Sequence, residues 1–471
     1  CRWRSPSGND LLLVYQKDYG EDEVLPDGKT VVSINFTGDN HGPHSYERVK
    51  KIYADLRKRY PQAQLVGASF NDVARELLLI KKDLPVVTSE IGDTWIFGYG
   101  GAPIRMAKFR AVSRLYSQWL NEGKIKKDSD VALDFAAELG LIAEHTQGVD
   151  VKTHLRQWDK YDMDKFLKGR SEGIFSMAEA SWKEIDNYID SAIAFLPASL
   201  QKEAREVVAE VDKVKLEDNS KMKPMERKRW EQPIAAGMTL AGLSYQMFDG
   251  DDYDDFQNRY LRARYGWALD DLGKRGLKES HAVSVTLYAQ TITQSVRKEK
   301  KGTRIITELR FPENEKVDKR VYPERIQVNC FTTKNGKRSE VALTIYGKPA
   351  VRLPESYWLS FTVPGIESVI AEKMGERVNL MDVVEKGNRQ MHGIDRYVDL
   401  ITSGETIRIS SKEAFLLNVG EAQGLNYSTN YPDKRKGAHF NLNNNLWGTN
   451  FSMWNEGSLT YHFVIETLNR K

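Results

Sequence analysis

The stretch RIQVNCFTTKNGKRSEVALTIYG, residues 325–347, decides the fold of the C-terminal half of the chain. Its two apolar runs alternate with a period of two and are rich in β-branched residues, and turn residues separate them. Six more runs of the same kind follow this pattern: SVTLYAQTITQSV (284–296), TRIITELRF (303–311), SYWLSFTV (356–363), ETIRISS (405–411), FLLNVG (415–420) and LTYHFVIETL (459–468). We therefore predict a large antiparallel β-sandwich over residues 225–471, with one helical insert at 251–265.

The middle of the chain has a different periodicity. Apolar residues recur every three to four positions in four segments with few helix breakers: 105–120, 131–145, 176–196 and 200–214. This spacing is typical of amphipathic helices. We predict a helical bundle over residues 104–224, joined to the β-sandwich by the polar linker LEDNSKMKPMERKRW.

The first 103 residues alternate between the two kinds of pattern. Strand-like TVVSINF (30–36), QLVGAS (64–69) and LPVVTSEIG (84–92) are separated by helical patterns at 45–60 and 70–80. This order predicts a parallel sheet with covering helices. Since the sheet is too short for a complete domain, we interpret residues 1–103 as the C-terminal half of an α/β domain. The predicted fold class is multidomain α+β.

The two helices of this region carry start signals. Ser45 is a plausible N-cap for the first helix, and Ser69 with Asp72 resembles a capping box at the start of the second.

Composition restricts the classes of function. The 471 residues carry a net charge of +3, too small to indicate a nucleic-acid partner, and no apolar run is long enough to span a membrane. Two cysteines, Cys1 and Cys330, make neither a disulfide framework nor a thiolate metal site. The start at Cys1 fits a matured lipoprotein or a truncated chain, and the strand-like residues that follow favour truncation.

Polar side chains follow two predicted strands of the N-terminal region. Asp39, Asn40 and His41 lie in the loop TGDNHGPH, and Asp93 and Trp95 lie in SEIGDTWIFGYGG. Ligands of open α/β sheets bind beyond the carboxyl ends of the strands, so these residues are candidates for a cleft. The alternative for the first loop is an Asx turn that caps the helix.

Three aromatic side chains and three glycines follow Asp93. Trp95, Phe97 and Tyr99 are suited to stacking on a sugar, and equally to an ordinary core or interdomain patch. The glycines at 98, 100 and 101 would let the backbone run close to another group.

His145 ends an apolar helical pattern, just before Gly148. A histidine at this place is either a packed residue bonded to a helix carbonyl or a ligand aimed into a cleft. The residues alone leave both readings open.

The stretch HFNLNNNLWGTNFSMW, residues 439–454, is rich in asparagine and tryptophan. Amides pair with sugar hydroxyls and indole faces stack on sugar rings, so Asn444, Trp447 and Asn450 are candidate substrate-binding residues. The alternative is a buried interdomain plug whose asparagines satisfy the backbone of loops.

Five motifs occur in one order along the chain: GDN with a following GP, EIGDTW, EHTQGVD, RLPESYWLSF and NNNLWGTNFSMW. In this order they resemble the bacterial domain-of-unknown-function family 5054, whose relatives are the α-mannosidases of glycoside hydrolase family 38. The resemblance covers most of the chain, and the order is more specific than any single motif.

The resemblance implies a metal-dependent retaining α-glycosidase that acts on glycans, in a periplasmic or secreted location. It assigns His145 as a zinc ligand and Asp39 as the acid/base carboxylate. Asn40, Asp93 and Trp95 are candidate substrate-binding residues from their place at the strand ends. Asn40 departs from the second Asp that some family members have in this loop. The nucleophile and the first zinc ligands would precede Cys1. The alternative is a carbohydrate-binding or scaffolding protein that keeps the fold without turnover.

Overall fold

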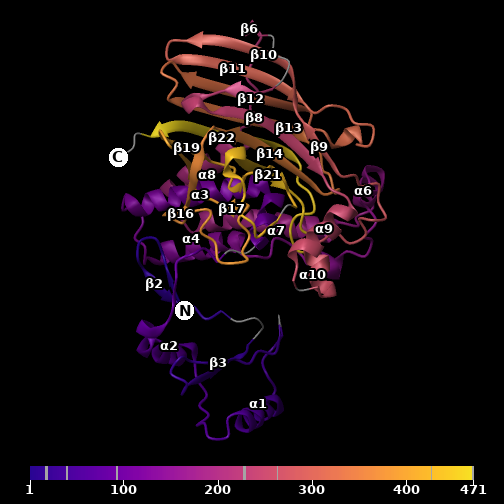
Figure 1. The fold of residues 1–471 in the computed structure, drawn as a ribbon. Helices are drawn as coiled ribbons and strands as arrows, with labels where there is room; N and C mark the ends of the chain where they lie inside the picture. The colour runs from indigo at the N-terminus through magenta and orange to yellow at the C-terminus, as the bar shows by residue number, and fades with distance from the viewer. Residues whose placement is uncertain are drawn as a thin grey trace. The chain divides into compact units, whose positions relative to one another are not determined.

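A computed structural model describes residues 1–15, 20–38, 41–91, 94–225, 230–262, 264–425 and 427–468. The chain divides into two compact units, Cys1–Glu90 and Ile91–Lys471, and each is described by itself (Figure 1).

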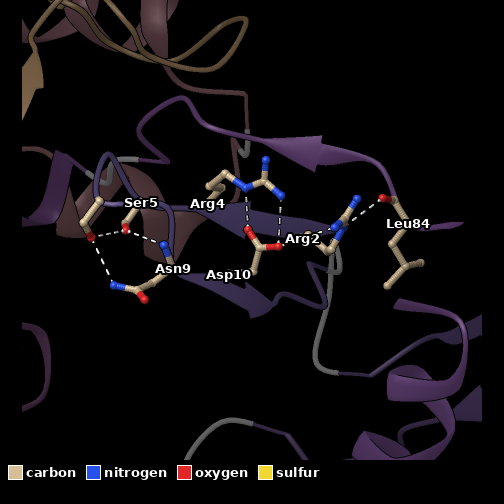
Figure 2. Close-up of polar contacts among 7 residues, drawn as sticks. Arg2, Arg4, Ser5, Asn9, Asp10 and Leu84 are labelled. Atoms are coloured by element: carbon tan, nitrogen blue, oxygen red, sulfur yellow. Dashed lines mark hydrogen bonds and ion pairs between the residues drawn. The ribbon is translucent and has the colours of Figure 1, made fainter. Parts of the chain in front are cut away.

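The first unit holds two small sheets. Strands β1 (Arg2–Arg4), β2 (Asp10–Leu12) and β5 (Val86–Val87) form one sheet in the order β2-β1-β5, in which only the β1–β5 pair is parallel. Strands β3 (Asp22–Val24) and β4 (Val31–Ser33) form an antiparallel pair. In Figure 2, Asp10 accepts hydrogen bonds from Arg4 (2.6 Å) and Arg2 (3.4 Å), so this carboxylate ties β2 to β1.

Two predicted helices of this unit are confirmed. Helix α1 spans Tyr46–Arg59 and α2 spans Phe70–Leu79, followed by the short helix η1 (Lys81–Asp83). Ser45 accepts a hydrogen bond from the backbone N–H of Arg48, and Ser69 forms a capping box with Asp72. Both cap predictions are confirmed.

The predicted three-stranded parallel sheet is wrong. Of TVVSINF only β4 is a strand, and it pairs antiparallel with β3. QLVGAS forms no strand, and β5 pairs with β1, a strand outside the predicted set. A short apolar run becomes a strand only where another strand pairs with its backbone, and the sequence pattern does not show which partner is within reach.

Helices α3, α4, α7 and α8 of the second unit lie together (Figure 1). All four predicted helices of residues 104–224 are present, and a buried cluster that includes Trp119, Phe135 and Ile193 holds them together. The bounds are η2 (Thr94–Gly101), α3 (Pro103–Asn121), α4 (Asp130–Gly140), η3 (Leu141–Ala143), α5 (Val151–His154), α6 (Met163–Ser171), α7 (Ser176–Ala194), α8 (Ala198–Asp212), η4 (Ala235–Gly237), α9 (Gly250–Tyr260), α10 (Gly266–Asp271), η5 (Lys319–Val321) and η6 (Lys434–Lys436).

Two antiparallel sheets make up the rest of this unit. A ten-stranded sheet has the order β16-β15-β18-β19-β22-β13-β12-β11-β10-β6, and a seven-stranded sheet has the order β17-β20-β21-β14-β8-β7 with β9 paired to β8. The bounds are β6 (Lys223–Pro224), β7 (Gln232–Pro233), β8 (Thr239–Met247), β9 (Val285–Tyr288), β10 (Gln290–Glu299), β11 (Gly302–Arg310), β12 (Arg325–Thr333), β13 (Arg338–Lys348), β14 (Glu355–Thr362), β15 (Ile366–Lys373), β16 (Glu376–Asn379), β17 (Met391–Gly393), β18 (Tyr397–Thr402), β19 (Thr406–Ser411), β20 (Leu416–Val419), β21 (Ala438–Asn444) and β22 (Gly457–Leu468).

The two sheets face each other across an aromatic core. Phe361 on β14 and Phe440 on β21 both pack on Phe463 of β22, with ring centroids 5.4 and 5.0 Å apart. The stretch at 325–347 forms the hairpin β12–β13, in which Ile326 pairs with Ile345. The predicted antiparallel sandwich is confirmed, and the overall fold is mixed α+β.

The helices and the sheets share hydrogen bonds. Arg110 on α3 is buried and donates to the backbone oxygens of Ile394 (3.2 Å) and Lys412 (3.2 Å). Burial lowers the pKa of Arg110 to about 10, so the guanidinium is charged at neutral pH. The helical segment 104–224 and the strands after residue 225 lie within one compact unit. The predicted division into domains at 1–103, 104–224 and 225–471 stays a prediction. No helix among the described residues has the length and apolar character to cross a membrane.

Candidate functional site

Two segments that the sequence singled out, the aromatic stretch after Asp93 and the loop with His145, are hydrogen-bonded to each other in the second unit. The indole N–H of Trp95 donates to the backbone oxygen of His145 at 3.3 Å. The hydroxyl of Tyr99 donates to the backbone oxygens of Ala143 (2.9 Å) and Glu144 (2.8 Å). Burial and the nearby Glu144 raise the pKa of Tyr99 to about 12, so the hydroxyl keeps its proton. The aromatic turn η2 thus holds the loop that carries His145.

The glycines of η2 allow this turn to approach the asparagine-rich segment. A Cβ on Gly98 would lie 2.4 Å from the ring of Phe451, and one on Gly100 would lie 2.2 Å from the side-chain nitrogen of Asn444. Asn444 in turn donates to the backbone oxygen of Phe97 at 3.1 Å. The prediction that the glycines permit a close approach is confirmed, and the neighbour is another part of the same chain.

The asparagines of residues 439–454 bind backbone oxygens. Asn445 donates to Val351 (3.0 Å), Leu353 (3.1 Å) and Met453 (2.9 Å), and Asn444 also donates to the side chain of Asn441 at 2.8 Å. These bonds satisfy loop backbone that would otherwise be buried without partners.

The tryptophan of this segment lies in the core. Trp447 is 1% exposed and stacks on Tyr427 with ring centroids 5.6 Å apart. Asn444 is 2% exposed, whereas Asn450 is only partly buried, and its side-chain oxygen makes no hydrogen bond to the described residues. In this arrangement Asn444 and Trp447 have no open surface to offer a substrate, so a role in sugar binding stays a prediction.

His145 lies at the surface. Its side chain is 71% exposed, and Nδ1 forms an ion pair with Glu144. Although partial burial raises the pKa of Glu144, hydrogen bonds from Thr146 and the neighbouring His145 lower it overall. No group of three or more His, Cys, Asp or Glu side chains that could hold a metal gathers among the residues the structure describes. Those residues alone do not fit a zinc ion, which needs about four ligands.

Three further predicted site residues, Asp39, Asn40 and Asp93, lie outside the described residues.

A cavity of about 320 Å³ lies beside these segments. Trp182 on α7 and Trp454 form two of its walls, with ring centroids 4.7 Å apart and planes at 82°. The other lining residues include the backbone of Gly101 and the charged side chains Arg105, Lys108, Asp186, Asp190 and Glu456. The cavity therefore combines aromatic surface with charged groups of both signs.

One of the charged groups, Asp186, is held in place by a network around Arg105. This guanidinium is 5% exposed and donates to Asp186 (2.6 Å), to the side-chain oxygen of Gln147 (3.1 Å) and to the backbone of Trp182 (2.9 Å). Asp190 is 72% exposed, so its carboxylate is open to a ligand. Gln147 belongs to the EHTQGVD motif, so the network joins the loop that carries His145 to the cavity.

The sequence interpretation missed the α7 residues of this cavity. Trp182, Asp186 and Asp190 follow one another at intervals of four, which places them on one face of a helix. The same spacing occurs on many solvated helix faces, so it does not distinguish a binding face from an ordinary one.

Comparisons with known proteins cover part of the chain. Residues 100–231 match the family described as "Domain of unknown function (DUF5054)", and over this range the expected resemblance is confirmed. No curated protein matches the chain.

Two similar solved structures come from Enterococcus faecalis. One is an α-mannosidase from strain V583, with a TM-score of 0.30 and 9% sequence identity. The match covers 52% of this chain and 29% of the α-mannosidase. The other is a protein in glycosyl hydrolase family 38, with a TM-score of 0.37 and 10% sequence identity. The match covers 90% of this chain and 63% of that protein. This chain spans less than two thirds of the length of either protein.

Proposed function

We propose that this chain belongs to a retaining α-glycosidase, similar to α-mannosidases, that acts on glycans. The observation that carries the proposal is the cavity lined by Trp182 and Trp454, which pack edge to face on each other, with Asp186 and Asp190 also in its wall. Indole surfaces and exposed carboxylates are the groups that bind sugar rings and their hydroxyls. The ordered motifs of the sequence and the family match at residues 100–231 support the same class.

The proposed roles follow the resemblance. Asp39 is the general acid and His145 is one ligand of a zinc ion. From their places in the sequence, Asn40, Asp93, Trp95 and Asn450 contact the substrate, whereas Asn444 and Trp447, assigned with them, are enclosed in this structure and would reach a substrate only if their segment rearranged. A retaining glycosidase needs a second carboxylate about 5 Å from the acid. That carboxylate and the other zinc ligands would have to come from outside the residues that the structure describes.

Hydrolysis of α-mannosides tests the proposal. The full-length protein is incubated with an α-linked mannose disaccharide and with 2,4-dinitrophenyl α-mannoside, before and after dialysis against a chelator and then with added zinc, because this chain is expected to be inactive by itself. We expect turnover that falls after chelation and returns with zinc, with α-mannose as the first product seen by NMR. A first product in the β form would contradict the retaining mechanism.

The role of Asp39 is tested by its effect on the two substrates. Asp39→Asn should slow hydrolysis of the disaccharide by about 10²–10⁴-fold, the range for loss of a general acid. The dinitrophenyl substrate should lose much less, because its leaving group needs no proton. Asp83→Asn, in η1, is the matched control and should leave both rates unchanged. An equal loss on both substrates would make Asp39 a structural residue.

A carbohydrate-binding protein without turnover is the second candidate. The cavity supports this candidate, because its wall combines indole rings with an exposed carboxylate at Asp190 and such a surface can bind a sugar without cleaving it. It predicts binding of mannose oligosaccharides by calorimetry with no release of sugar. Asp190→Asn should weaken that binding, whereas Asp134→Asn on α4 should not. Equal binding by both variants would show that this cavity does not bind the sugar, in an enzyme or in a binding protein.

A further inference from the structure

Buried cations in the second unit normally have several acceptors. The ammonium of Lys348 is paired with Glu355 at 2.5 Å and also donates to two backbone oxygens. The guanidinium of Arg389, which is 6% exposed, donates to the backbone oxygens of four residues. Such partners offset the cost of taking a charge out of water.

Arg352 departs from this rule. It is 2% exposed, and its one hydrogen bond to the described residues is a long one, 3.4 Å from Nη1 to the backbone oxygen of Trp158. The guanidinium also lies over the rings of Tyr161 (4.1 Å) and Phe175 (5.2 Å). An arginine has five N–H donors, and aromatic faces satisfy none of them as an acceptor oxygen would. Four donors of Arg352 therefore have no acceptor among the described residues.

Carboxylates do not fill this gap. Asp159 acts on Arg352 through space, but it is bound to Lys160 at 3.3 Å, and no carboxylate among the described residues lies within ion-pair distance of Arg352. Among the described residues the guanidinium is thus acted on by Asp159 only through space and forms no ion pair.

A second cation lies beside the first. The ammonium of Lys274 donates to the backbone oxygen of Trp447 at 2.8 Å, and it too has no carboxylate within ion-pair distance in the described ranges. Burial, and then the charge of Arg352, lower the pKa of Lys274 to about 7. The guanidinium of Arg352 and the ammonium of Lys274 are therefore close enough to repel each other in a region with little water, and a nearby negative charge would stabilise both.

A small pocket is lined by both side chains. Its volume is about 10 Å³, room for one particle of the size of a water molecule, and its lining includes Lys274, Arg352, the indole of Trp158 and the backbone of Gly448. Arg275 lines the same pocket, with its guanidinium 5.0 Å from the Trp158 ring. The pocket thus has three cations and no acidic side chain in its wall.

We propose that this pocket binds one small inorganic anion of the size of chloride. The anion would accept hydrogen bonds from the unused N–H groups of Arg352 and from the ammonium of Lys274, and it would neutralise their repulsion. A water molecule could fill the same volume but would supply no charge. The site is distinct from the cavity at Trp182 and does not depend on the proposed glycosidase function.

The direct test is chloride NMR on the whole chain. Exchange of chloride with a protein site broadens the ³⁵Cl signal, so the wild-type protein should broaden it, and bromide should reverse the effect by competition. Lys274→Met should abolish this broadening. Lys278→Met, which removes an exposed lysine paired with Asp254, is the matched control and should broaden the signal as the wild type does. Equal broadening by both variants, or none by the wild type, would overturn the proposal.

A second measurement covers a variant that folds poorly. The melting temperature of the wild type is recorded at constant ionic strength while chloride replaces gluconate, which is too large for the pocket. A ligand that binds only the folded state raises the melting temperature as its concentration rises. We expect such a rise in the wild type and in Lys278→Met. A wild-type melting temperature that does not change with chloride would show that the pocket holds only water.

Discussion

The two compact units bury their apolar side chains to different extents. In the first unit, α1 buries none of its fourteen residues, and Phe70 and Leu79 of α2 are 70% and 79% exposed. In the second unit, Trp119, Phe135 and Trp358 are fully buried. The same amphipathic pattern produces helices in both units, so a helix can form from its local sequence whether or not its apolar face is covered.

Strands, unlike these helices, form only where another segment of the chain pairs with them. The ten-stranded sheet of the second unit consists of strands in which apolar residues alternate with polar ones, and each finds a partner nearby. In the first unit QLVGAS has strand-like residues and forms no strand. Strand formation depends on pairing as well as on residue type. Stability should therefore respond to mutation in the second unit far more than in the first.

The largest contrast should come from matched aromatic truncations. Trp447→Ala removes a ring packed against Phe256 and Tyr427 and should lower the free energy of unfolding by about 3–5 kcal/mol. Phe70→Ala removes an exposed ring and should change it by less than about 0.5 kcal/mol. Urea denaturation followed by fluorescence and circular dichroism measures both. A small loss for Trp447→Ala, together with impaired sugar binding, would return this residue to the substrate site.

The next effect concerns a buried histidine in the same segment. Burial lowers the pKa of His439 on β21 to about 4, from an ordinary value near 6.5. The folded state then binds fewer protons than the unfolded state, so stability is complete above pH 6.5 and falls as the pH drops toward 4. The loss at pH 4 amounts to about 3 kcal/mol.

His439→Asn tests this prediction because an amide can keep the bond that Nδ1 makes with the hydroxyl of Ser360 at 2.9 Å. Unfolding free energies at pH 7 and pH 4.5 should differ by about 2–3 kcal/mol less in this variant than in the wild type. His154→Asn, at an exposed position, should keep the wild-type difference. If His439→Asn keeps it as well, the acid sensitivity of the fold arises elsewhere.

The smallest effect should come from the first unit. The Ser69 side chain caps α2, where it accepts from the backbone N–H of Asp72 and donates to its carboxylate at 2.7 Å. Ser69→Ala should destabilise this helix by about 1 kcal/mol, whereas Ser69→Asp should keep most of the cap. Hydrogen exchange of the α2 amides measures the difference. Unchanged exchange in Ser69→Ala would mean that packing, rather than the cap, holds α2.

The candidate site was predictable only in outline. Their residue types made Trp95, His145 and the asparagine-rich segment candidates for a binding site. In the structure these segments are joined by hydrogen bonds of Trp95, Tyr99 and Asn444. The same types suit a sugar site or a packed junction, so the sequence could not separate the two uses. Asp186 and Asp190 escaped notice because the partner that gives Asp186 its setting, Arg105, lies far away in the chain.

By itself the sequence determined helices α1, α2, α3, α4, α7 and α8 and the caps of α1 and α2, because these depend on neighbours within a few positions. It also indicated the hairpin β12–β13, whose two strands are joined by a short turn and so pair locally. Only the tertiary structure decided which strands pair in the first unit, why glycines are needed at 98 and 100, and that Trp447 packs against Phe256 and Tyr427. The physical reason is that burial and pairing depend on groups distant in sequence. A residue's type sets what it can bind, but its neighbours in space decide whether it is exposed to do so.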